Sequence, residues 1–173
     1  HKYMNIWIIN NMEDGVAGYA YYPSATADAG SSWKDGIIIR YNYIGSLFPS
    51  NVGTSRALTH EIGHWLNLRH IWGDATCGSD LVGDTPLHNT ANYGCPTYPH
   101  LSTCTGTPVE MTMNYMDYVQ DNCMYMFTAG QATRMQAYYN SIASQFVQNA
   151  LGNETQLLKQ FAIAPNPSKG TFE

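Results

Sequence analysis

Two short apolar segments stand out near the start of the chain. Residues 2–10 (KYMNIWIIN) combine β-branched and aromatic side chains and end at asparagine, and residues 36–43 (GIIIRYNY) contain three consecutive isoleucines. Both segments predict β-strands, and the second is too continuously apolar for a half-exposed edge. Residues 16–22 form a weaker candidate strand, and the small polar residues at 25–32 indicate a loop.

Two further segments carry apolar residues at helical spacing. Residues 54–66 have an apolar stripe, with Thr54 or Ser55 as the expected N-cap. Residues 129–149 repeat apolar side chains every three or four positions, and Thr128 with Gln131 matches a capping box at the start. We therefore expect one helix in the middle of the chain and one near its end.

The segment between these helices has no sustained periodicity. Residues 73–108 are rich in Gly, Pro, Asp, Asn and Thr, and a loop of this length requires a function or cross-links. The four cysteines lie at 77, 95, 104 and 123, and none forms a Cys-X-X-Cys pair. This favours two disulfides and an oxidising compartment over a second metal site. Three pairings are possible, and four reduced thiols in a cytosolic enzyme are the alternative.

The end of the chain differs from the rest, and we expect a main domain at 1–150 followed by a linker at 151–173. Residues 161–172 (FAIAPNPSKGTF) resemble the opening of the C-terminal sorting domain that Bacteroidetes use for type IX secretion, cut off after its first strand. A Pro-rich linker is the alternative. The chain begins at His1 without an initiator Met, which indicates a processed or trimmed piece of a longer protein.

Composition and charge exclude several classes of protein. Hydrophobic residues make up 44% of the chain and charged residues 12%, as in a globular domain. The net charge is −5 and the eight Lys and Arg are scattered, so no basic stripe is available for nucleic acid. No apolar run approaches the roughly 18 residues that a membrane span needs. Neither nucleic-acid binding nor membrane insertion is expected.

The strongest chemical signal is the segment HEIGHWLNLRH at residues 60–70. On a helix, the rings of His60 and His64 lie about 40° apart and roughly 6 Å apart along the axis, so both can bind one zinc. Glu61 follows the first ligand directly, where it can take a proton from a metal-bound water. The HExxH pattern alone occurs often by chance, so a third ligand decides the interpretation.

His70 is the expected third ligand, provided that the helix ends before it. A continuing helix would leave His70 on the wrong side and about 9 Å away. Asn67 lies where the chain must reverse, and after glycine it best tolerates the left-handed conformation that ends a helix. The sequence therefore predicts a three-histidine zinc site formed by a helix and a reversal of the chain.

This pattern resembles the metzincin metallopeptidases, HExxHxxGxxH, with Asn67 at the usual glycine position. The segment NYMDY at 114–118 resembles their Met-turn, in which Met116 would form a hydrophobic floor beneath the zinc ligands. Together with GDTP at 83–86 and FTAGQATRM at 127–135, these motifs resemble the pappalysin family (M43) over most of the chain.

The resemblance implies a fold. Pappalysins are secreted zinc endopeptidases of the metzincin type, with an α+β (α/β/α-like) architecture. A twisted, mostly parallel sheet would lie over the active-site helix, followed by an irregular disulfide-linked subdomain that ends in a helix. The resemblance also implies that an early strand and a backing helix of the catalytic domain are missing from this chain.

The resemblance further implies a role for each residue of the site. The three histidines would hold one catalytic zinc, and Glu61 would act as general base and then general acid. Tyr118 would steady the oxyanion, with a packed core phenol as the alternative. Asp121 would lie at the base of the S1′ pocket, where an acidic group favours Arg or Lys after the scissile bond. A solvated loop carboxylate is the alternative for Asp121.

Asp80, Asp84 and Thr85 match the calcium-binding loop of the family, with hard oxygen ligands in a Gly-rich segment. Asx-type turns are the alternative explanation. The family spacing also implies the disulfides Cys77–Cys104 and Cys95–Cys123.

Four aromatic or histidine residues near these motifs receive no catalytic role. His88 and His100 lack a partner at ligand spacing, so we interpret both as surface residues. Trp65 and Trp72 flank the site and are interpreted as packing residues.

The expected function is a secreted zinc metalloendopeptidase acting on proteins or peptides, exported through a bacterial type IX system. A gluzincin or aspzincin would need a distant acidic ligand, and Glu110 is the only Glu between His70 and Glu154. A catalytically silent zinc-binding adhesion or binding module is a second alternative, although it would be expected to have lost Glu61 or a ligand. A third is that the fragment folds poorly and is inactive by itself.

Overall fold

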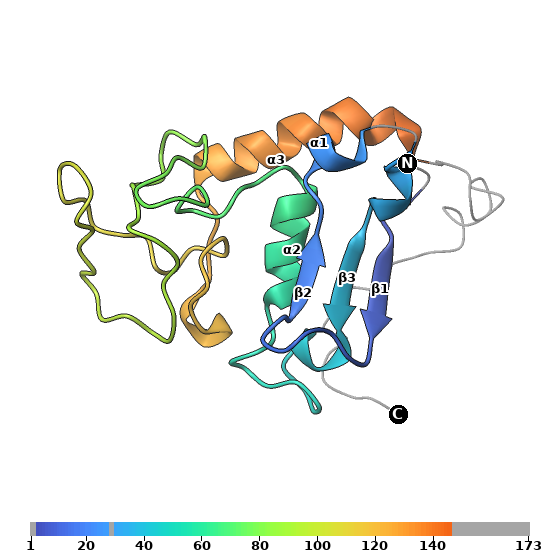
Figure 1. The fold of residues 1–173 in the computed structure, drawn as a ribbon, viewed down its shortest axis with the longest axis horizontal. Helices are drawn as coiled ribbons and strands as arrows, with labels where there is room; N and C mark the ends of the chain where they lie inside the picture. Colours follow the sequence, from blue (N-terminus) through green and yellow to red (C-terminus); the bar gives the residue numbers. More distant parts are fainter. Residues whose placement is uncertain (1–2, 28–29, 147–173) are drawn as a thin grey trace, which may run out of the picture.

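The computed structural model describes residues 3–27 and 30–146 (Figure 1). Three short strands, β1 (Ile6–Ile9), β2 (Gly18–Ala20) and β3 (Ile37–Arg40), form one sheet in the order β1-β3-β2. These are the three expected strands, each shorter than its apolar segment. The predicted linker and sorting-domain segment at 151–173 lies outside the described residues.

The sheet is mixed, because β3 pairs in parallel with β1 but antiparallel with β2. The chain reverses between β1 and β2 through a turn that includes Gly15 at φ +82°, so β2 runs back along the sheet. It reverses again through α1 (Pro23–Thr26) and η1 (Ser32–Lys34) before β3. The expected mostly parallel sheet is therefore not found among the described strands.

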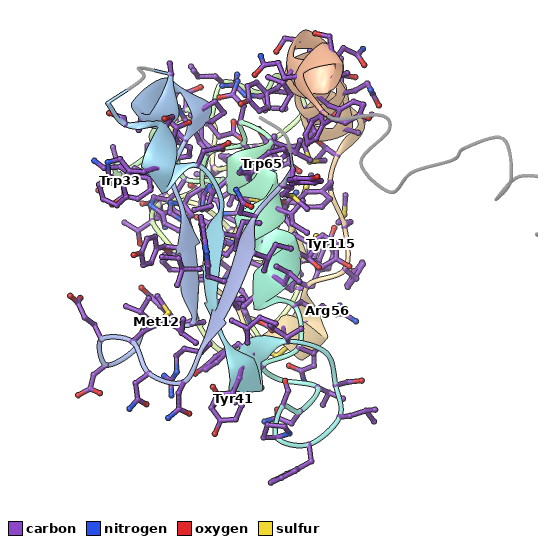
Figure 2. All side chains as sticks on the ribbon, turned by 90° about the vertical axis from the view of Figure 1, so that its right-hand side faces the viewer. Met12, Trp33, Tyr41, Arg56, Trp65 and Tyr115 are labelled. Carbon is purple, nitrogen blue, oxygen red and sulfur yellow. A yellow bond between two sulfur atoms is a disulfide. The ribbon has the colours of Figure 1, made fainter. Side chains whose placement is uncertain are left out.

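Helix α2 (Ala57–Trp65) packs against β2 and β3 on one face of the sheet (Figure 1). In β3, Ile37 and Ile39 are fully buried toward this face because alternate residues of a strand point the same way. They form a core cluster with Trp65 and Ile142. Figure 2 shows Trp65 and Arg56 at opposite ends of α2.

The N-cap of α2 is Arg56, so the prediction of Thr54 or Ser55 is wrong. The Arg56 side chain provides no capping bond; instead its backbone N–H donates to the carboxylate of Asp121, far along the chain. The hydroxyl of Thr54 lies within hydrogen-bonding distance of the Asn42 carbonyl oxygen. A distant residue therefore supplies the acceptor that the helix N-terminus needs.

The last helix, α3 (Ala129–Ile142), runs across the end of α2 (Figure 1). Its predicted capping box is confirmed, since Thr128 and Gln131 exchange side-chain and backbone hydrogen bonds. It ends earlier than expected and continues as η4 (Ala143–Gln145), and residues 147–149 lie outside the described part. None of the described helices is long and apolar enough to cross a membrane.

Between α2 and α3 the chain is irregular, as predicted. The only helical turn there in the described structure is η3 (Asp121–Cys123), and the remaining pairing consists of isolated bridges. Both predicted disulfides, Cys77–Cys104 and Cys95–Cys123, are present. This region covers one side of α2 and holds a second core cluster, formed by Leu68, Ile71, Trp72 and Met116.

Candidate metal centre

Helix α2 positions two histidines and a glutamate at the base of the site. His60, Glu61 and His64 are all buried. Gly63 lies between them, and a Cβ at this position would come within 2.5 Å of the Met116 sulfur. The absence of a side chain at Gly63 therefore lets Met116, in the segment predicted as the Met-turn, pack closely against α2.

The chain reverses at Asn67, as the sequence predicts. Asn67 has φ 74°, in the left-handed region. The N–H of Leu68 donates to the Gly63 carbonyl at 2.8 Å and the N–H of Asn67 donates to the His64 carbonyl at 2.9 Å. This pair of bonds is a Schellman motif, which satisfies the last carbonyl groups of the helix.

A contact from α3 supports this reversal. The Arg134 guanidinium donates from Nε to the Asn67 carbonyl oxygen at 2.6 Å. The positive charge also lies at the C-terminal end of α2, where the helix dipole favours a cation.

The reversal brings His70 back to the two helical histidines. The ligand atoms of His60, His64 and His70 lie within 4.8 Å of one another, and Nε2 of His64 is 3.0 Å from Nε2 of His70. Two ligands of a tetrahedral zinc lie roughly 3.3 Å apart when each bond is about 2.0 to 2.1 Å. Within residues 3–27 and 30–146 no other group of His, Cys, Asp or Glu meets the same criterion, and Glu110 does not join these histidines.

Each imidazole is oriented by a hydrogen bond from its other nitrogen, Nδ1. The partners of His60, His64 and His70 are the carbonyl oxygens of Tyr115 (2.6 Å) and Leu68 (2.9 Å) and the carboxylate of Asp74, respectively. Because these oxygens can only accept, Nδ1 carries the proton and Nε2 keeps a free electron pair. The arrangement matches the way histidines are held when they bind a metal.

Burial keeps the three rings neutral. It lowers the pKa of His64 to about 4, with the neighbouring His70 adding to the effect, and it lowers the pKa of His60 and His70 below the usual range. Neutral imidazoles can donate electron pairs to a cation at neutral pH, so the residues present fit a zinc ion.

The Glu61 carboxyl group is buried beside the histidines. Burial raises the pKa of its carboxyl group to about 8, and a backbone contact with Ala20 offsets only part of this effect. Oε2 of Glu61 has no hydrogen-bond partner among the described residues. A carboxyl group with such a pKa can both accept and release a proton near neutral pH.

An open cleft of about 500 Å³ leads to Glu61 and His60. Its lining includes the segment 15–18, which leads into β2, together with Tyr93, Tyr118 and Asp121. Gly18 fits closely here, because a Cβ would lie 2.9 Å from the Ile38 carbonyl and 3.3 Å from Cγ of Glu61. The lack of a side chain at position 18 therefore leaves room for the Glu61 carboxyl side chain beside the cleft.

Tyr118 lies in this cleft and not in the core. Its side chain is 42% exposed, and its ring centroid is 4.8 Å from that of His70 and 5.6 Å from that of His60. Burial of part of the phenol, together with the nearby Glu61, raises its pKa to about 12, so the hydroxyl keeps its proton. The alternative of a packed core phenol does not agree with this position.

Met116 packs against Gly63 of α2, and Asp121 lies at the N-terminus of the same helix. Met116 is fully buried and its carbonyl accepts a hydrogen bond from the Ile71 N–H at 3.0 Å, directly after the third histidine. Asp121 lines the cleft while it accepts from the backbone of Arg56. It is therefore not a solvated loop carboxylate.

The residues expected to bind calcium separate into two places. Asp80 is buried and accepts from the Thr85 hydroxyl at 2.8 Å and the Val82 N–H at 3.1 Å, while its Oδ2 has no partner among the described residues. Asp84 instead accepts from the Thr128 hydroxyl at 2.7 Å and the Gly130 N–H at 2.8 Å, at the start of α3.

The interpretation of His88 as a surface residue is wrong. His88 is fully buried, and its Nε2 accepts from the Met111 N–H at 2.9 Å. It faces the buried carboxylates of Glu110 and Asp117, and the amide of Asn92 donates to both of them. This polar network lies in a segment without periodicity, so no pattern in the sequence indicated it.

His100 lies at the margin of this network, with its Nε2 3.7 Å from Glu110 and its side chain 40% exposed. Trp65 and Trp72 are buried packing residues, as predicted. The sequence predicted no role for Asp74, the hydrogen-bond partner of His70. The spacing of four residues between them was the only signal that could have indicated the contact.

Known proteins similar to this chain are metallopeptidases. The profile of the M43 peptidase family, described as pregnancy-associated plasma protein-A, matches residues 1–140. The extracellular metalloproteases of Sordaria macrospora and Neurospora crassa are 38% and 39% identical over 142 and 145 residues, covering 81% of this chain and 49% of each relative. The chain thus spans about half the length of the curated relatives it matches.

Two solved structures of mirolysin are similar to this chain. Mature mirolysin from Tannerella forsythia in complex with a cleaved peptide is 40% identical, with a TM-score of 0.71 over 80% of this chain and 52% of that chain. Mirolysin in complex with a small compound gives a TM-score of 0.72 over 81% of this chain and 53% of that chain.

Proposed function

Because the chain belongs to the M43 family of metallopeptidases, we propose that it is a zinc metalloendopeptidase that hydrolyses proteins or peptides. The observation that carries this proposal is the convergence of three Nε2 electron pairs beside a buried carboxyl group at an open cleft. The cleaved peptide named with mirolysin supports peptides as the substrate class.

His60, His64 and His70 would hold the zinc. When bound, zinc supplies a Lewis acid that polarises a carbonyl group and acidifies water. The protein contributes the neutral rings, the Nδ1 hydrogen bonds that orient them, and the hydrophobic floor formed by Met116.

Glu61 would move the proton during hydrolysis. Its unpartnered Oε2 and its raised pKa support a role as general base toward water in the cleft and then as general acid toward the leaving amine. No covalent intermediate is needed. Tyr118 would donate a hydrogen bond to the oxyanion, which its protonated hydroxyl and its position beside His60 and His70 support.

Asp121 would favour Arg or Lys at the position after the scissile bond. Its carboxylate lines the cleft, where it would pair with a basic side chain. The backbone bond to Arg56 uses Oδ2. We expect a modest preference rather than an absolute requirement, since part of the acceptor capacity is already occupied.

The proposal also includes a calcium site. Asp80, whose Oδ2 is buried without a hydrogen-bond partner among the described residues, and Thr85 would contribute to a calcium site. The contacts of Asp84 at the start of α3 instead favour a helix-capping role.

The proposal further includes secretion, which extracellular relatives and two disulfides support. Export through a type IX system rests on residues 161–172 alone.

A peptide-cleavage assay tests the function. The protein is incubated with casein and with matched fluorogenic peptides that carry Arg or Leu after the cleaved bond, with and without a zinc chelator. We expect hydrolysis that the chelator abolishes and that returns with added zinc, faster for the Arg peptide. Zinc binding without any hydrolysis would instead support the silent binding module.

A further inference from the structure

We propose that Asp74 is a positioning residue that holds the third histidine in its metal-binding orientation, with Tyr22 supporting the carboxylate from the other side. This inference rests on the proposed zinc site. The contact that carries it is the hydrogen bond from Nδ1 of His70 to Oδ1 of Asp74. Oδ2 of the same carboxylate accepts from the Tyr22 hydroxyl at 3.2 Å.

His70 needs such support more than the other two ligands. His60 and His64 are buried on a regular helix, and their Nδ1 partners are backbone carbonyl groups. His70 lies beyond the end of α2, its side chain is 15% exposed, and its Nδ1 partner is a side chain. The orientation of the third ring therefore depends on the identity of one residue.

The turn after His70 is built so that Asp74 returns toward the ring. The N–H of Gly73 donates to the His70 carbonyl at 2.8 Å, and both Gly73 and Asp74 have positive φ, at 63° and 59°. A Cβ on Gly73 would lie 2.5 Å from backbone atoms of Ser79, so only glycine fits. Aspartate is among the few residues that tolerate a positive φ.

The neighbouring ring of Trp72 restricts the orientation of the His70 ring further. Trp72 stacks on it with ring centroids 4.3 Å apart and an interplanar angle of 8°. Stacking sets the plane of the ring, and the bond to Asp74 sets its rotation within that plane. A negative partner also makes a histidine a stronger electron donor toward a metal.

Tyr22 extends this support across the metal centre. It lies between β2 and α1, and its ring meets the His64 ring edge-on at 5.3 Å while its hydroxyl contacts Asp74. The pair Tyr22–Asp74 thus joins the sheet side of the molecule to the turn beyond α2. Zinc affinity should depend on both residues, and more on Asp74.

The test measures zinc affinity by competition with a chromophoric chelator at constant pH. Asp74→Gly removes the carboxylate without strain at the positive φ, Asp74→Asn keeps an acceptor but loses the charge, and Tyr22→Phe removes only the hydroxyl. Glu13→Gln is the matched control, because it removes one negative charge at an exposed position outside the cleft lining.

We expect Asp74→Gly to weaken zinc binding by about 10- to 100-fold, the usual effect of losing such a partner, with smaller losses of roughly three- to tenfold for Asp74→Asn and about twofold for Tyr22→Phe. Glu13→Gln should match the unmodified protein. The visible spectrum of the cobalt-substituted protein should change in Asp74→Gly, because the ligand field depends on the position of His70.

Thermal melting of the metal-free proteins separates positioning from folding. If metal-free Asp74→Gly fails to fold, the zinc affinity and the cobalt spectrum of Asp74→Asn test the inference instead. Zinc affinity and cobalt spectra equal to those of the unmodified protein in the folded variant would overturn the inference while the proposed function stands. Failure of the unmodified protein to bind zinc would overturn both.

Discussion

The site is assembled from two regions that are built in different ways. Helix α2 contributes His60, Glu61 and His64 from a regular element that packs on a sheet. The region from Asn67 to Phe127 contributes His70, Tyr118 and the floor of the site from loops held by disulfides and buried polar contacts. In the first region position follows from helix geometry, whereas in the second it follows from individual side-chain contacts.

The largest expected effect concerns the regular region. Glu61→Gln should keep the three ligands and bind zinc, but hydrolysis of a fluorogenic peptide should fall by about 10²- to 10⁴-fold because the general base is lost. Zinc content and kcat/KM are measured on the same sample. Hydrolysis at the unmodified rate by the variant would exclude Glu61 as the base.

The irregular region should respond most to loss of its cross-links. Replacing Cys77 and Cys104 together by serine should lower the free energy of unfolding by about 2 to 4 kcal/mol, because a disulfide constrains the unfolded chain. Denaturant unfolding measures the change. Replacing two exposed serines by alanine serves as a control, and equal stability of the cysteine variant would show that the loops are held by other contacts.

A third variant probes the junction between the two regions. Gly63→Ala normally favours a helix, but here the added Cβ would lie 2.5 Å from the sulfur of Met116. We expect a net destabilisation of about 1 to 3 kcal/mol from overpacking, measured by thermal unfolding. A more stable variant would mean that Met116 moves aside without cost.

The smallest expected effect comes from the contact that α3 makes with the helix end. Arg134→Ala removes the hydrogen bond to the Asn67 carbonyl, and we expect a loss of about 1 to 2 kcal/mol in stability. Gln136→Ala is the control on the same helix, because it truncates an exposed side chain whose hydrogen bond goes only to Asn140 of α3. Equal melting temperatures for both variants would show that the Schellman motif alone maintains the reversal.

The two regions also differ in what the sequence predicts. Periodicity predicted the existence of α2, although the helix begins three residues later than expected, and the tolerance of Asn67 for positive φ predicted the reversal that brings in His70. The N-cap was not predictable in this way, because its acceptor comes from Asp121, far along the chain. Local signals cannot encode a contact made only after folding.

For the irregular region, the residues themselves predicted a long cross-linked loop, while most of the detail within it came from the resemblance to a family. The pairing of the cysteines came from that resemblance, and three pairings were open without it. The burial of His88 against Glu110 and Asp117 escaped prediction, because polar residues in a segment without periodicity look the same whether solvated or enclosed. The role of Asp74 was not predicted, because its contact with His70 depends on its positive φ and not on a pattern in the neighbouring sequence.

The carboxylate of Asp121 anchors the first turn of α2 while it faces the substrate cleft. If Asp121 sets the proposed preference for Arg or Lys, an apolar replacement made to change that preference would also remove the acceptor at the N-terminus of the helix that carries His60 and His64. A successful redesign would have to supply a substitute acceptor for the Arg56 amide, for example from a neighbouring serine or asparagine. The proposed selectivity and the capping of α2 thus depend on the same carboxylate.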